Sequence, residues 1–372
     1  FRGDRSSVAE SARRKGYLRP VPAGVVPAPP SPKLGALRMR ALAAELPGQL
    51  RDGFRAGREI APAAAGRSAT VFAVGLGGSA ISADLARGVV ESETPVAVEV
   101  VRSYELPRAV ERRSRVFLVS YSGDTWETLH AYDRAGRVGA SRVVITSGGA
   151  LADRAERDEV PMLALPSGLP PRCAGGFVLG GILGLLDPWF PESNEDRVER
   201  LARTLAALIV RYARPSGPAA SIANRIGLRF PVIYGDVALS GLALRWKTQF
   251  EENAKRVAIS GELPEVLHNS LVGWDAIAAA ESARYATVLL DWTGAPPLLR
   301  RASRYLERLL VQRRVRVIRV PLGPEERLEA IVTGLALGDH VSLFLAEERR
   351  VDPYPIDAIT RLKSALAERA PR

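Results

Sequence analysis

The sequence predicts an α/β fold with two doubly wound parallel sheets, one in each half of the chain. Short continuous runs of aliphatic residues, such as residues 116–119 and 287–291, alternate with longer helical segments in both halves. Continuous apolar strands between helices indicate a parallel sheet covered on both faces. Turns rich in glycine and serine follow several of these runs, where such sheets bind ligands. The length of 372 residues is enough for two domains.

Residues 1–36 are predicted to form a basic, proline-rich extension. Arginines are frequent at its start and prolines cluster between residues 20 and 32, without helix or strand periodicity. Such a stretch buries too little apolar surface to offset the entropy of ordering, so we expect it to be mobile and dispensable. Met39 opens the first convincing helix.

The N-terminal domain is predicted to span residues 37–190. Its strands are expected at residues 71–74, 96–101, 116–119, 143–146 and 162–165. The longest uninterrupted apolar run, residues 174–186, contains several glycines and is expected to be a buried helix. It is shorter than the roughly 18 residues that cross a membrane.

The C-terminal domain is predicted to span residues 191–372. A segment rich in proline and acidic residues, 187–196, interrupts the strand and helix pattern and marks the boundary. Strands are expected at residues 232–234, 287–291 and 315–320, and a final helix at about residues 356–368. The shared alternation suggests an old duplication, although no clean sequence repeat is visible.

Two turns have the composition of a phosphate site. Ser120, Ser122 and Thr125 crowd the end of one predicted strand and the start of the next helix. Hydroxyls and free helix N–H groups supply the many small donors that a phosphate monoester needs, whereas an ordinary helix cap needs only one such residue. The upstream turn at residues 77–79 joins strand to helix through glycines, which allow a ligand to approach the backbone closely.

The upstream turn also fits a dinucleotide-binding pattern. Gly75, Gly77 and Ala80 match G-x-G-x-x-A, and Glu99 lies at about the spacing of a ribose-binding acid. Many strand–turn–helix units match this pattern, and the hydroxyl-rich turn favours a sugar phosphate over a nicotinamide cofactor. A dinucleotide-binding enzyme therefore stays as an alternative hypothesis, which a titration with a nicotinamide cofactor would test.

A third segment carries groups that move protons near neutral pH. Glu251 and Glu252 end a helix-like run that begins at Trp246, and a proline-containing turn then leads to His268. Carboxylates and imidazole are the usual general acids and bases of proteins. Paired glutamates on a helix more often lie on a solvent-exposed face, so this segment supports proton-transfer chemistry only in combination with the two phosphate-type turns.

Taken together, these motifs resemble the bifunctional phosphoglucose/phosphomannose isomerase family, whose members carry sugar isomerase (SIS) domains. The resemblance rests on Ser-Tyr-Ser-Gly-Asp-Thr at 120–125, Trp-Lys-Thr-Gln-Phe-Glu-Glu-Asn at 246–253 and Glu-Leu-Pro-Glu-Val-Leu-His-Asn at 262–269, with Gly-Gly-Ser at 77–79 and Thr-Ser-Gly-Gly at 146–149. It covers roughly residues 38–372 and implies two SIS-type, flavodoxin-like domains. It also implies an enzyme that interconverts glucose 6-phosphate, and mannose 6-phosphate, with fructose 6-phosphate.

The resemblance implies a role for each matched residue. Glu252, with Glu251 as the alternative, is the base that moves a proton between C1 and C2 through a cis-enediol. Arg172 stabilises the enediolate. His268 and Lys363 open the sugar ring, and His268 reaches the active site from the partner subunit, which implies a homodimer. The phosphosugar is bound by Gly77, Gly78, Ser79, Ser120, Ser122 and Thr125.

The resemblance also implies metal-independent chemistry without a cofactor, and no His, Cys or acidic residues have metal-ligand spacing. One position departs from the family pattern. The family has a small hydroxyl residue about two turns before the final-helix lysine, and Ile356 stands there, with Tyr354 and Thr360 nearby. The second hypothesis is a non-catalytic SIS-type regulator, which would keep the hydroxyl turn without needing Glu252, His268 and Lys363 together.

Composition adds expectations about compartment and partners. The net charge of +11 permits nucleic-acid binding but also suits a protein that binds sugar phosphates, so we expect no nucleic acid or membrane partner. Cys173 is the only cysteine and the start of the sequence lacks a signal-peptide pattern, so a cytoplasmic location is expected. Thermolabile side chains are scarce, a thermophile trend that a GC-rich genome would also produce.

Overall fold

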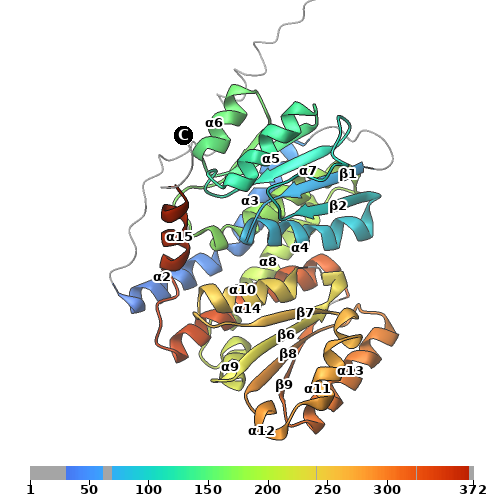
Figure 1. Cartoon of the computed structure of the whole chain (residues 1–372), viewed down its shortest axis with the longest axis vertical. Coiled ribbons are helices and arrows are strands. Elements are labelled where there is room, and N and C mark those ends of the chain that lie inside the picture. Colours follow the sequence, from blue (N-terminus) through green and yellow to red (C-terminus); the bar gives the residue numbers. More distant parts are fainter. Residues whose placement is uncertain (1–30, 62–68, 240, 324, 368–372) are drawn as a thin grey trace, which may run out of the picture.

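The computed structural model describes residues 31–61, 69–239, 241–323 and 325–367. It contains two parallel sheets, one above the other in Figure 1, with helices between them. The first sheet has the strand order β2-β1-β3-β4-β5 and the second has the order β7-β6-β8-β9. The predicted α/β fold with two doubly wound sheets is therefore confirmed.

The first sheet follows the predicted strands closely. It comprises β1 (Ala69–Val74), β2 (Val96–Val101), β3 (Arg115–Val119), β4 (Ser141–Thr146) and β5 (Met162–Ala164). Alternate residues face opposite sides. Phe117 and Val119 belong to the core shared with α3 (Leu46–Glu59), α4 (Gly78–Glu93) and α7 (Gly175–Leu186). Val116 and Leu118 pack beneath α5 (Trp126–Arg137) and α6 (Gly149–Arg157).

The second sheet contains one strand that the sequence analysis missed. It comprises β6 (Phe230–Asp236), β7 (Ile259–Leu263), β8 (Tyr285–Trp292) and β9 (Arg316–Leu322). The missed strand β7 lies at one end of the strand order and, among the described residues, pairs only with β6. Only Ile259 and Leu263 are large apolar residues in it, so it has no continuous aliphatic run. Its helices are α9 (Pro218–Ile226), α10 (Leu242–Glu252), α11 (Ser270–Ala276), α12 (Ala279–Ser282) and α13 (Pro297–Gln312).

One long helix forms the centre of the molecule. The helix α14 (Arg327–Glu348) packs against α10 and α8 (Glu195–Tyr212), and one continuous apolar core extends from the first sheet through this layer to the second. By length and composition alone, α14 could cross a membrane, yet 89% of its apolar window is buried inside the protein. It therefore packs as a core helix. The apolar run at residues 174–186 forms the shorter buried helix α7, as predicted.

The helices α3 and α7 approach each other through glycines. A Cβ atom on Gly180 of α7 would lie 2.2 Å from the carbonyl oxygen of Leu50, and one on Gly53 of α3 would lie 2.3 Å from that of Phe177. Any larger residue would collide with backbone atoms. These glycines allow the two helices to pack closely beneath the first sheet.

The ends of the described chain differ from expectation in detail. The helix α2 (Pro32–Ala44) begins before Met39, because Ser31 caps it by accepting a hydrogen bond from the Leu34 amide at 3.4 Å, and Pro32 is well suited to a first turn. Residues 1–30, most of the predicted extension, lie outside the described residues. The final helix is α15 (Asp357–Ala367), as predicted.

The segment predicted as a domain boundary is a well-bonded turn. It contains η2 (Asp187–Trp189), and the buried Asp187 carboxylate accepts hydrogen bonds from the Asn194 amide at 2.8 Å and from the Ser193 hydroxyl at 3.1 Å. The helix α8 then packs against α3 of the first half and α14 of the second. A boundary near residue 190 stays a prediction.

Candidate active site

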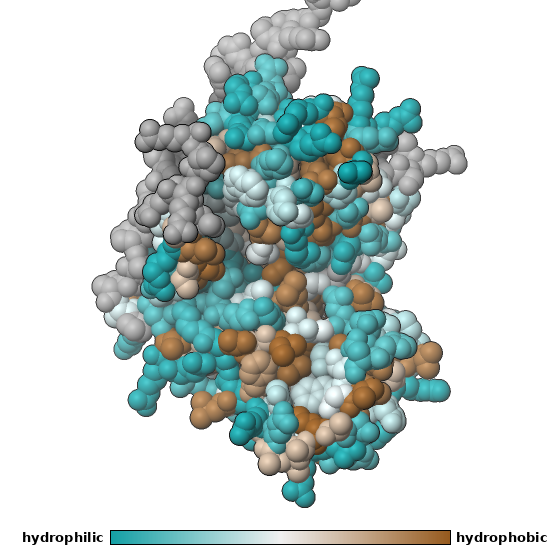
Figure 2. Space-filling view, in the orientation of Figure 1, coloured by the Kyte–Doolittle hydropathy of each residue, from teal (hydrophilic) through white to brown (hydrophobic). Residues whose placement is uncertain are grey.

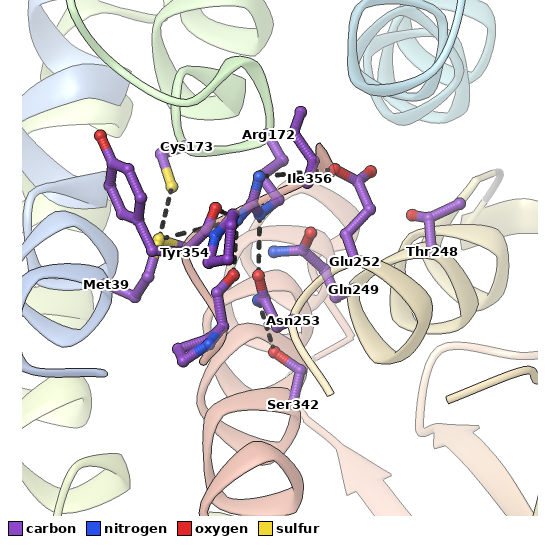
Figure 3. A network of polar contacts seen from close by, with 12 residues as sticks. Met39, Arg172, Cys173, Thr248, Gln249, Glu252, Asn253, Ser342, Tyr354 and Ile356 are labelled. Carbon is purple, nitrogen blue, oxygen red and sulfur yellow. Dashed lines mark hydrogen bonds and ion pairs between the residues drawn. The ribbon is translucent and has the colours of Figure 1, made fainter. Parts of the chain in front are cut away.

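An arginine and a glutamate from opposite halves of the chain meet between the two sheets. Arg172 lies in η1 (Pro171–Cys173), after the first sheet, and Glu252 is the last residue of α10. The Arg172 Nη1 and Glu252 Oε2 atoms are 3.6 Å apart (Figure 3). The Glu252 side chain is 26% exposed, whereas that of Arg172 is 1% exposed. The pair therefore joins a fixed buried cation to a carboxylate that solvent can reach.

The Arg172 guanidinium is held by hydrogen bonds on two of its nitrogens. Its Nε atom donates to Asn253 Oδ1 at 2.8 Å. Its Nη2 atom donates to the carbonyl oxygens of Pro353 and Tyr354, at 2.7 and 2.8 Å. Among the described residues, Nη1 has no hydrogen-bond partner and faces Glu252. A buried donor without a partner is costly, so Nη1 is the atom best placed to bind an oxygen of a ligand.

The two adjacent glutamates have different surroundings. Glu251 forms an ion pair with Lys247 one helical turn earlier, at 2.7 Å. Glu252 instead faces Arg172. Consecutive residues on a helix point about 100° apart, so only one of them can face the cation. The geometry favours Glu252 over Glu251 as the functional carboxylate.

A polar network behind Arg172 was not predicted. Asn253 Nδ2 donates to Ser342 Oγ at 2.8 Å, and Ser342 Oγ donates to the Asp339 carbonyl at 2.6 Å. The Asp339 carboxylate accepts hydrogen bonds from Arg245, and the Arg245 Nη2 atom also donates to the Arg172 carbonyl at 2.8 Å. Arg245 lies one residue before the Trp246–Asn253 motif, but Asp339 and Ser342 lie on α14, far away in sequence. Only the tertiary fold brings them together.

The glycine turn of the first sheet lies next to Arg172. Gly77 has φ of +54° and precedes the first residue of α4. A Cβ atom on Gly78 would lie 3.7 Å from the Cα atom of Arg172. The first amides of α4, from Gly78, Ser79 and Ala80, are the ones that lack carbonyl partners within a helix. The turn thus presents N–H donors and the positive end of a helix close to Arg172.

The hydroxyl-rich turn is shaped by its own side chains. Ser120 Oγ is 2.8 Å from Thr125 Oγ1 and accepts the Gly123 amide at 3.2 Å. Thr125 precedes α5 but makes no capping hydrogen bond, so capping does not explain it. Ser122 is half-buried and its hydroxyl accepts the Asp124 amide at 3.4 Å. Because β1 and β3 are adjacent parallel strands, this turn and the glycine turn meet at one edge of the sheet.

Tyr121 links the hydroxyl-rich turn to the loop that carries Arg172. Its hydroxyl donates to the Pro166 carbonyl at 2.7 Å and accepts the Leu169 amide at 2.8 Å. Burial raises the pKa of Tyr121, so the hydroxyl stays protonated at neutral pH. Tyr121 belongs to the motif that was singled out in the sequence, but its role in holding this loop was not predicted.

Two predicted site residues lie outside this network. His268 follows η4 (Glu265–Leu267) and is exposed, and its backbone amide donates to the Glu265 carbonyl at 2.9 Å. Lys363 is exposed on α15. Within the described part of this single chain, no hydrogen bond or ion pair connects either residue to Arg172 or Glu252. Their predicted roles stay predictions.

The single cysteine is a packed thiol. Cys173 Sγ lies 3.9 Å from the Met39 sulfur, and burial raises the pKa of the Cys173 thiol to about 12. It is therefore protonated at neutral pH, as expected for a residue without a nucleophilic role. Across residues 31–61, 69–239, 241–323 and 325–367, no three His, Cys, Asp or Glu side chains converge as metal ligands would.

Solved structures share this architecture. A hypothetical protein from Thermus thermophilus superposes with a TM-score of 0.70 at 16% identity, covering 91% of this chain and 94% of that one. The C-terminal domain of glucosamine-fructose-6-phosphate aminotransferase from Francisella tularensis superposes with a TM-score of 0.64 at 12% identity, covering 86% and 97%. At such low identity these similarities concern the fold.

Sequence comparisons identify the family. Residues 216–366 match the model of the bacterial phospho-glucose isomerase C-terminal SIS domain. The bifunctional phosphoglucose/phosphomannose isomerase of Caldicellulosiruptor bescii is 33% identical over 344 residues, which are 87% of this chain and 97% of that protein. The enzyme of the same name from Aquifex aeolicus is 33% identical over 297 residues, 80% and 90% of the two chains. The chain therefore belongs to the bifunctional phosphoglucose/phosphomannose isomerase family.

Proposed function

We propose that this protein interconverts glucose 6-phosphate and fructose 6-phosphate by moving a proton between C1 and C2. The observation that carries the proposal is the Arg172–Glu252 pair, 3.6 Å apart and next to the Gly78 turn. The proposal is supported by the proximity of this carboxylate and buried cation to the glycine turn, which we expect to bind the phosphate of the sugar. Family membership, with relatives named phosphoglucose/phosphomannose isomerase, supports the same substrates.

Glu252 and Arg172 divide the chemistry of the open-chain sugar. The Glu252 carboxylate removes the proton at C2, and the C–H electron pair forms the C1–C2 double bond as the C1 oxygen becomes negative. Arg172 Nη1 stabilises that oxygen, since a fixed cation needs no reorganisation during the reaction. The hydroxyl proton moves from O2 to O1, and Glu252 returns its proton to C1, which leaves the ketone at C2.

The phosphate binds where the two turns meet. The α4 amides after Gly77 and the hydroxyls of Ser79, Ser122 and Thr125 donate to the phosphate oxygens, and the buried Ser120 keeps its turn in shape. Phosphate binding at this end of the sheet aligns the other end of the sugar with Glu252. Binding energy from the phosphate then orients the reacting carbons.

Ring opening requires an acid, and in the described residues of one chain no hydrogen bond or ion pair connects His268 or Lys363 to the Arg172–Glu252 pair. His268 of a partner subunit supplies it in a homodimer. This part of the proposal is supported by exposed apolar side chains before and after His268 in the sequence, namely Ile259 on the edge strand β7 and Val272 on α11, which are 51% and 72% exposed. Figure 2 shows hydrophobic patches on the lower half of the molecule, the half that contains the second sheet. Such surfaces are typical of protein interfaces.

Lys363 assists ring opening from the last helix in the same proposal. It is exposed on α15, whose first residues follow the 353–355 segment that binds Arg172. A cytoplasmic location completes the proposal, in keeping with the single cysteine.

Mannose 6-phosphate is the second substrate, and we expect slower turnover of it. The family pattern has a small hydroxyl residue where this chain has Ile356. Ile356 follows the segment whose carbonyls bind Arg172, and Figure 3 shows it among the residues of the network. Replacing Ile356 with threonine is expected to raise the rate with mannose 6-phosphate relative to glucose 6-phosphate. An unchanged ratio would remove Ile356 from the account of specificity.

A coupled assay tests the proposed reaction. Glucose 6-phosphate and mannose 6-phosphate are each supplied, with and without EDTA, and the formation of fructose 6-phosphate is followed at several temperatures. We expect turnover that EDTA does not abolish. Tight binding of the sugar phosphates without turnover at any temperature would instead support the regulator hypothesis.

A further inference from the structure

Lys255 occupies an unusual place directly after the Arg172–Glu252 site. It lies three residues beyond Glu252 and has φ of +51°, in the left-handed region that non-glycine residues rarely adopt. This conformation reverses the chain after α10 and turns the lysine toward the 353–355 segment, where its ammonium binds. Glu159, Arg314 and Arg350 adopt the same conformation beyond other helix ends, so the case for Lys255 rests on the contacts of its side chain.

The Lys255 ammonium joins the two segments that form the site. Its Nζ atom donates to the carbonyl oxygen of Glu252. It also donates to the carbonyl oxygens of Pro355 at 2.6 Å and Pro353 at 3.5 Å. The Pro353 carbonyl oxygen also accepts a hydrogen bond from Arg172 Nη2, so this one carbonyl binds both cations. An ammonium has three N–H donors, and all three are used on main-chain oxygens.

The charges around Lys255 come from four elements. Partial burial, together with the nearby Arg172 guanidinium on η1, lowers the pKa of Lys255 to about 8. Three carboxylates raise the pKa of Lys255 instead: Asp352 on the loop before the prolines, Glu252 on α10 and Asp357 on α15. The ammonium is therefore present at neutral pH and is lost as the pH rises through about 8.

We propose that Lys255 is a positioning residue for the isomerisation: its ammonium fixes the end of α10 against the 353–355 segment and so sets the separation of Glu252 from Arg172. This inference rests on the proposed function. Because its three donors are occupied by carbonyl oxygens, Lys255 acts through Glu252 and Arg172 and does not touch the substrate. The same contacts set the path of the chain into Ile356 and α15.

Lys255→Met is the first test, with Lys33→Met as the matched control. Methionine keeps the length of the apolar stem of lysine without the terminal ammonium and has the same difficulty in adopting a positive φ, but it donates no hydrogen bond. A misplacement of about 1 Å in a catalytic group costs roughly 10²-fold in rate, so we expect a fall in kcat of that order with KM changed only a few-fold. Lys33 is exposed on α2, and its replacement is expected to leave both constants unchanged.

Lys255→Arg and a pH profile separate positioning from a general loss of stability. Wild-type kcat is expected to decline as the pH rises through about 8, because the ammonium is lost. Arginine keeps its charge to above about pH 12, so Lys255→Arg is expected to restore part of the activity and to lack that decline. A decline near pH 8 that persists in Lys255→Arg would overturn the assignment.

Hydrogen–deuterium exchange of the full chain gives a readout that does not depend on catalysis. Peptides that cover residues 351–360 are expected to exchange faster in Lys255→Met than in the wild type and in Lys33→Met. Unchanged exchange there, or unchanged kcat in Lys255→Met alongside an active wild type, would overturn the inference. Absence of turnover in the wild type, with faster exchange in Lys255→Met, would refute the proposed reaction and leave the structural role of Lys255 intact.

Discussion

At the residue scale, two adjacent carboxylates at the end of α10 differ in what they contact. Glu252 faces Arg172, whereas Glu251 pairs with Lys247. We predict that Glu252→Gln lowers kcat by roughly 10³-fold or more, since even assisting acid–base groups contribute about 10²–10⁴-fold. The amide keeps the shape of the side chain and lacks useful basicity, so sugar-phosphate binding, measured by calorimetry, is expected to survive.

Glu251→Gln is the matched control for this prediction. It removes the same charge from the same helix end but breaks only a partly exposed ion pair, which contributes little to stability. We expect its kcat to stay within a few-fold of the wild type. Equal losses in the two variants, or a larger loss in Glu251→Gln, would reverse the assignment of the base.

The reactivity of Cys173 follows from its surroundings. Because burial raises the pKa of its thiol to about 12, compared with about 8.5 in an unfolded chain, the folded protein has roughly 10³-fold less thiolate at neutral pH. We expect iodoacetamide to alkylate Cys173 slowly in the folded protein and rapidly in urea, as measured by mass spectrometry. Labelling in the folded protein is expected to accelerate as the pH rises. Equally fast labelling in both states would contradict the burial of this thiol.

At the scale of elements, the close packing of α3 and α7 gives a prediction about stability. Gly180→Ala would place a Cβ atom 2.2 Å from the Leu50 carbonyl oxygen, so the two helices would have to separate. Overpacking of this kind costs typically about 1–3 kcal/mol, and chemical denaturation is expected to show a loss of at least that size.

Gly48 provides the control on α3. A Cβ atom on Gly48 meets nothing within 4 Å. Alanine is a better helix former than glycine by about 1 kcal/mol, so Gly48→Ala is expected to stabilise the protein or leave it unchanged. If Gly180→Ala were as stable as Gly48→Ala, the close contact between α3 and α7 would be wrong.

The same scale explains what could be predicted from the sequence. The inner strands β3 and β4 of the first sheet are mostly buried aliphatic runs, and the edge strand β2 alternates buried and exposed residues, so composition and periodicity located them. The edge strand β7 has the small or polar residues Ser260, Gly261 and Glu262 between Ile259 and Leu263, so it has no aliphatic run. It is a strand because it pairs with β6, and no local sequence pattern shows that pairing. The helix α2 began earlier than predicted because its start depends on a local cap at Ser31.

The site was predicted only in part for the same physical reason. Glu252 lies in the motif at residues 246–253, whereas Arg172 lies outside the listed motifs and was assigned only through the family resemblance. Ser342, which accepts a hydrogen bond from Asn253, and Asp339, which binds Arg245, lie in the middle of a long apolar helix without a motif of their own. Contacts between residues so distant along the chain depend on how the two halves pack, and no local pattern records them.

At the scale of the whole molecule, the proposed homodimer gives a complementation test. Glu252→Gln and His268→Ala are each expected to be inactive with the closed-ring sugar, and their mixture is expected to recover activity. Each mixed dimer would hold one site with both wild-type residues, so under two-fold symmetry the isolated heterodimer is expected to have about half of the wild-type rate, and an unseparated random mixture about a quarter. The heterodimer is isolated with two affinity tags before the assay.

The control for this experiment mixes Glu252→Gln with Arg172→Met. Arg172 and Glu252 form their pair within one chain, so a mixed dimer has no site in which both are intact. Recovery is therefore expected only in the mixture with His268→Ala. An inactive heterodimer of Glu252→Gln and His268→Ala would show that His268 does not act across the interface.

The central claim is that Glu252 carries a proton between C1 and C2, and hydrogen exchange during turnover tests it most directly. Glucose 6-phosphate is converted in D₂O, and deuterium at C1 of the fructose 6-phosphate is measured by NMR. With the wild type we expect some deuterium at C1, because a proton held on a partly exposed carboxylate exchanges with solvent. With Glu252→Gln we expect neither product nor exchange. Product formed without any deuterium under all conditions, or wild-type exchange in Glu252→Gln, would contradict it.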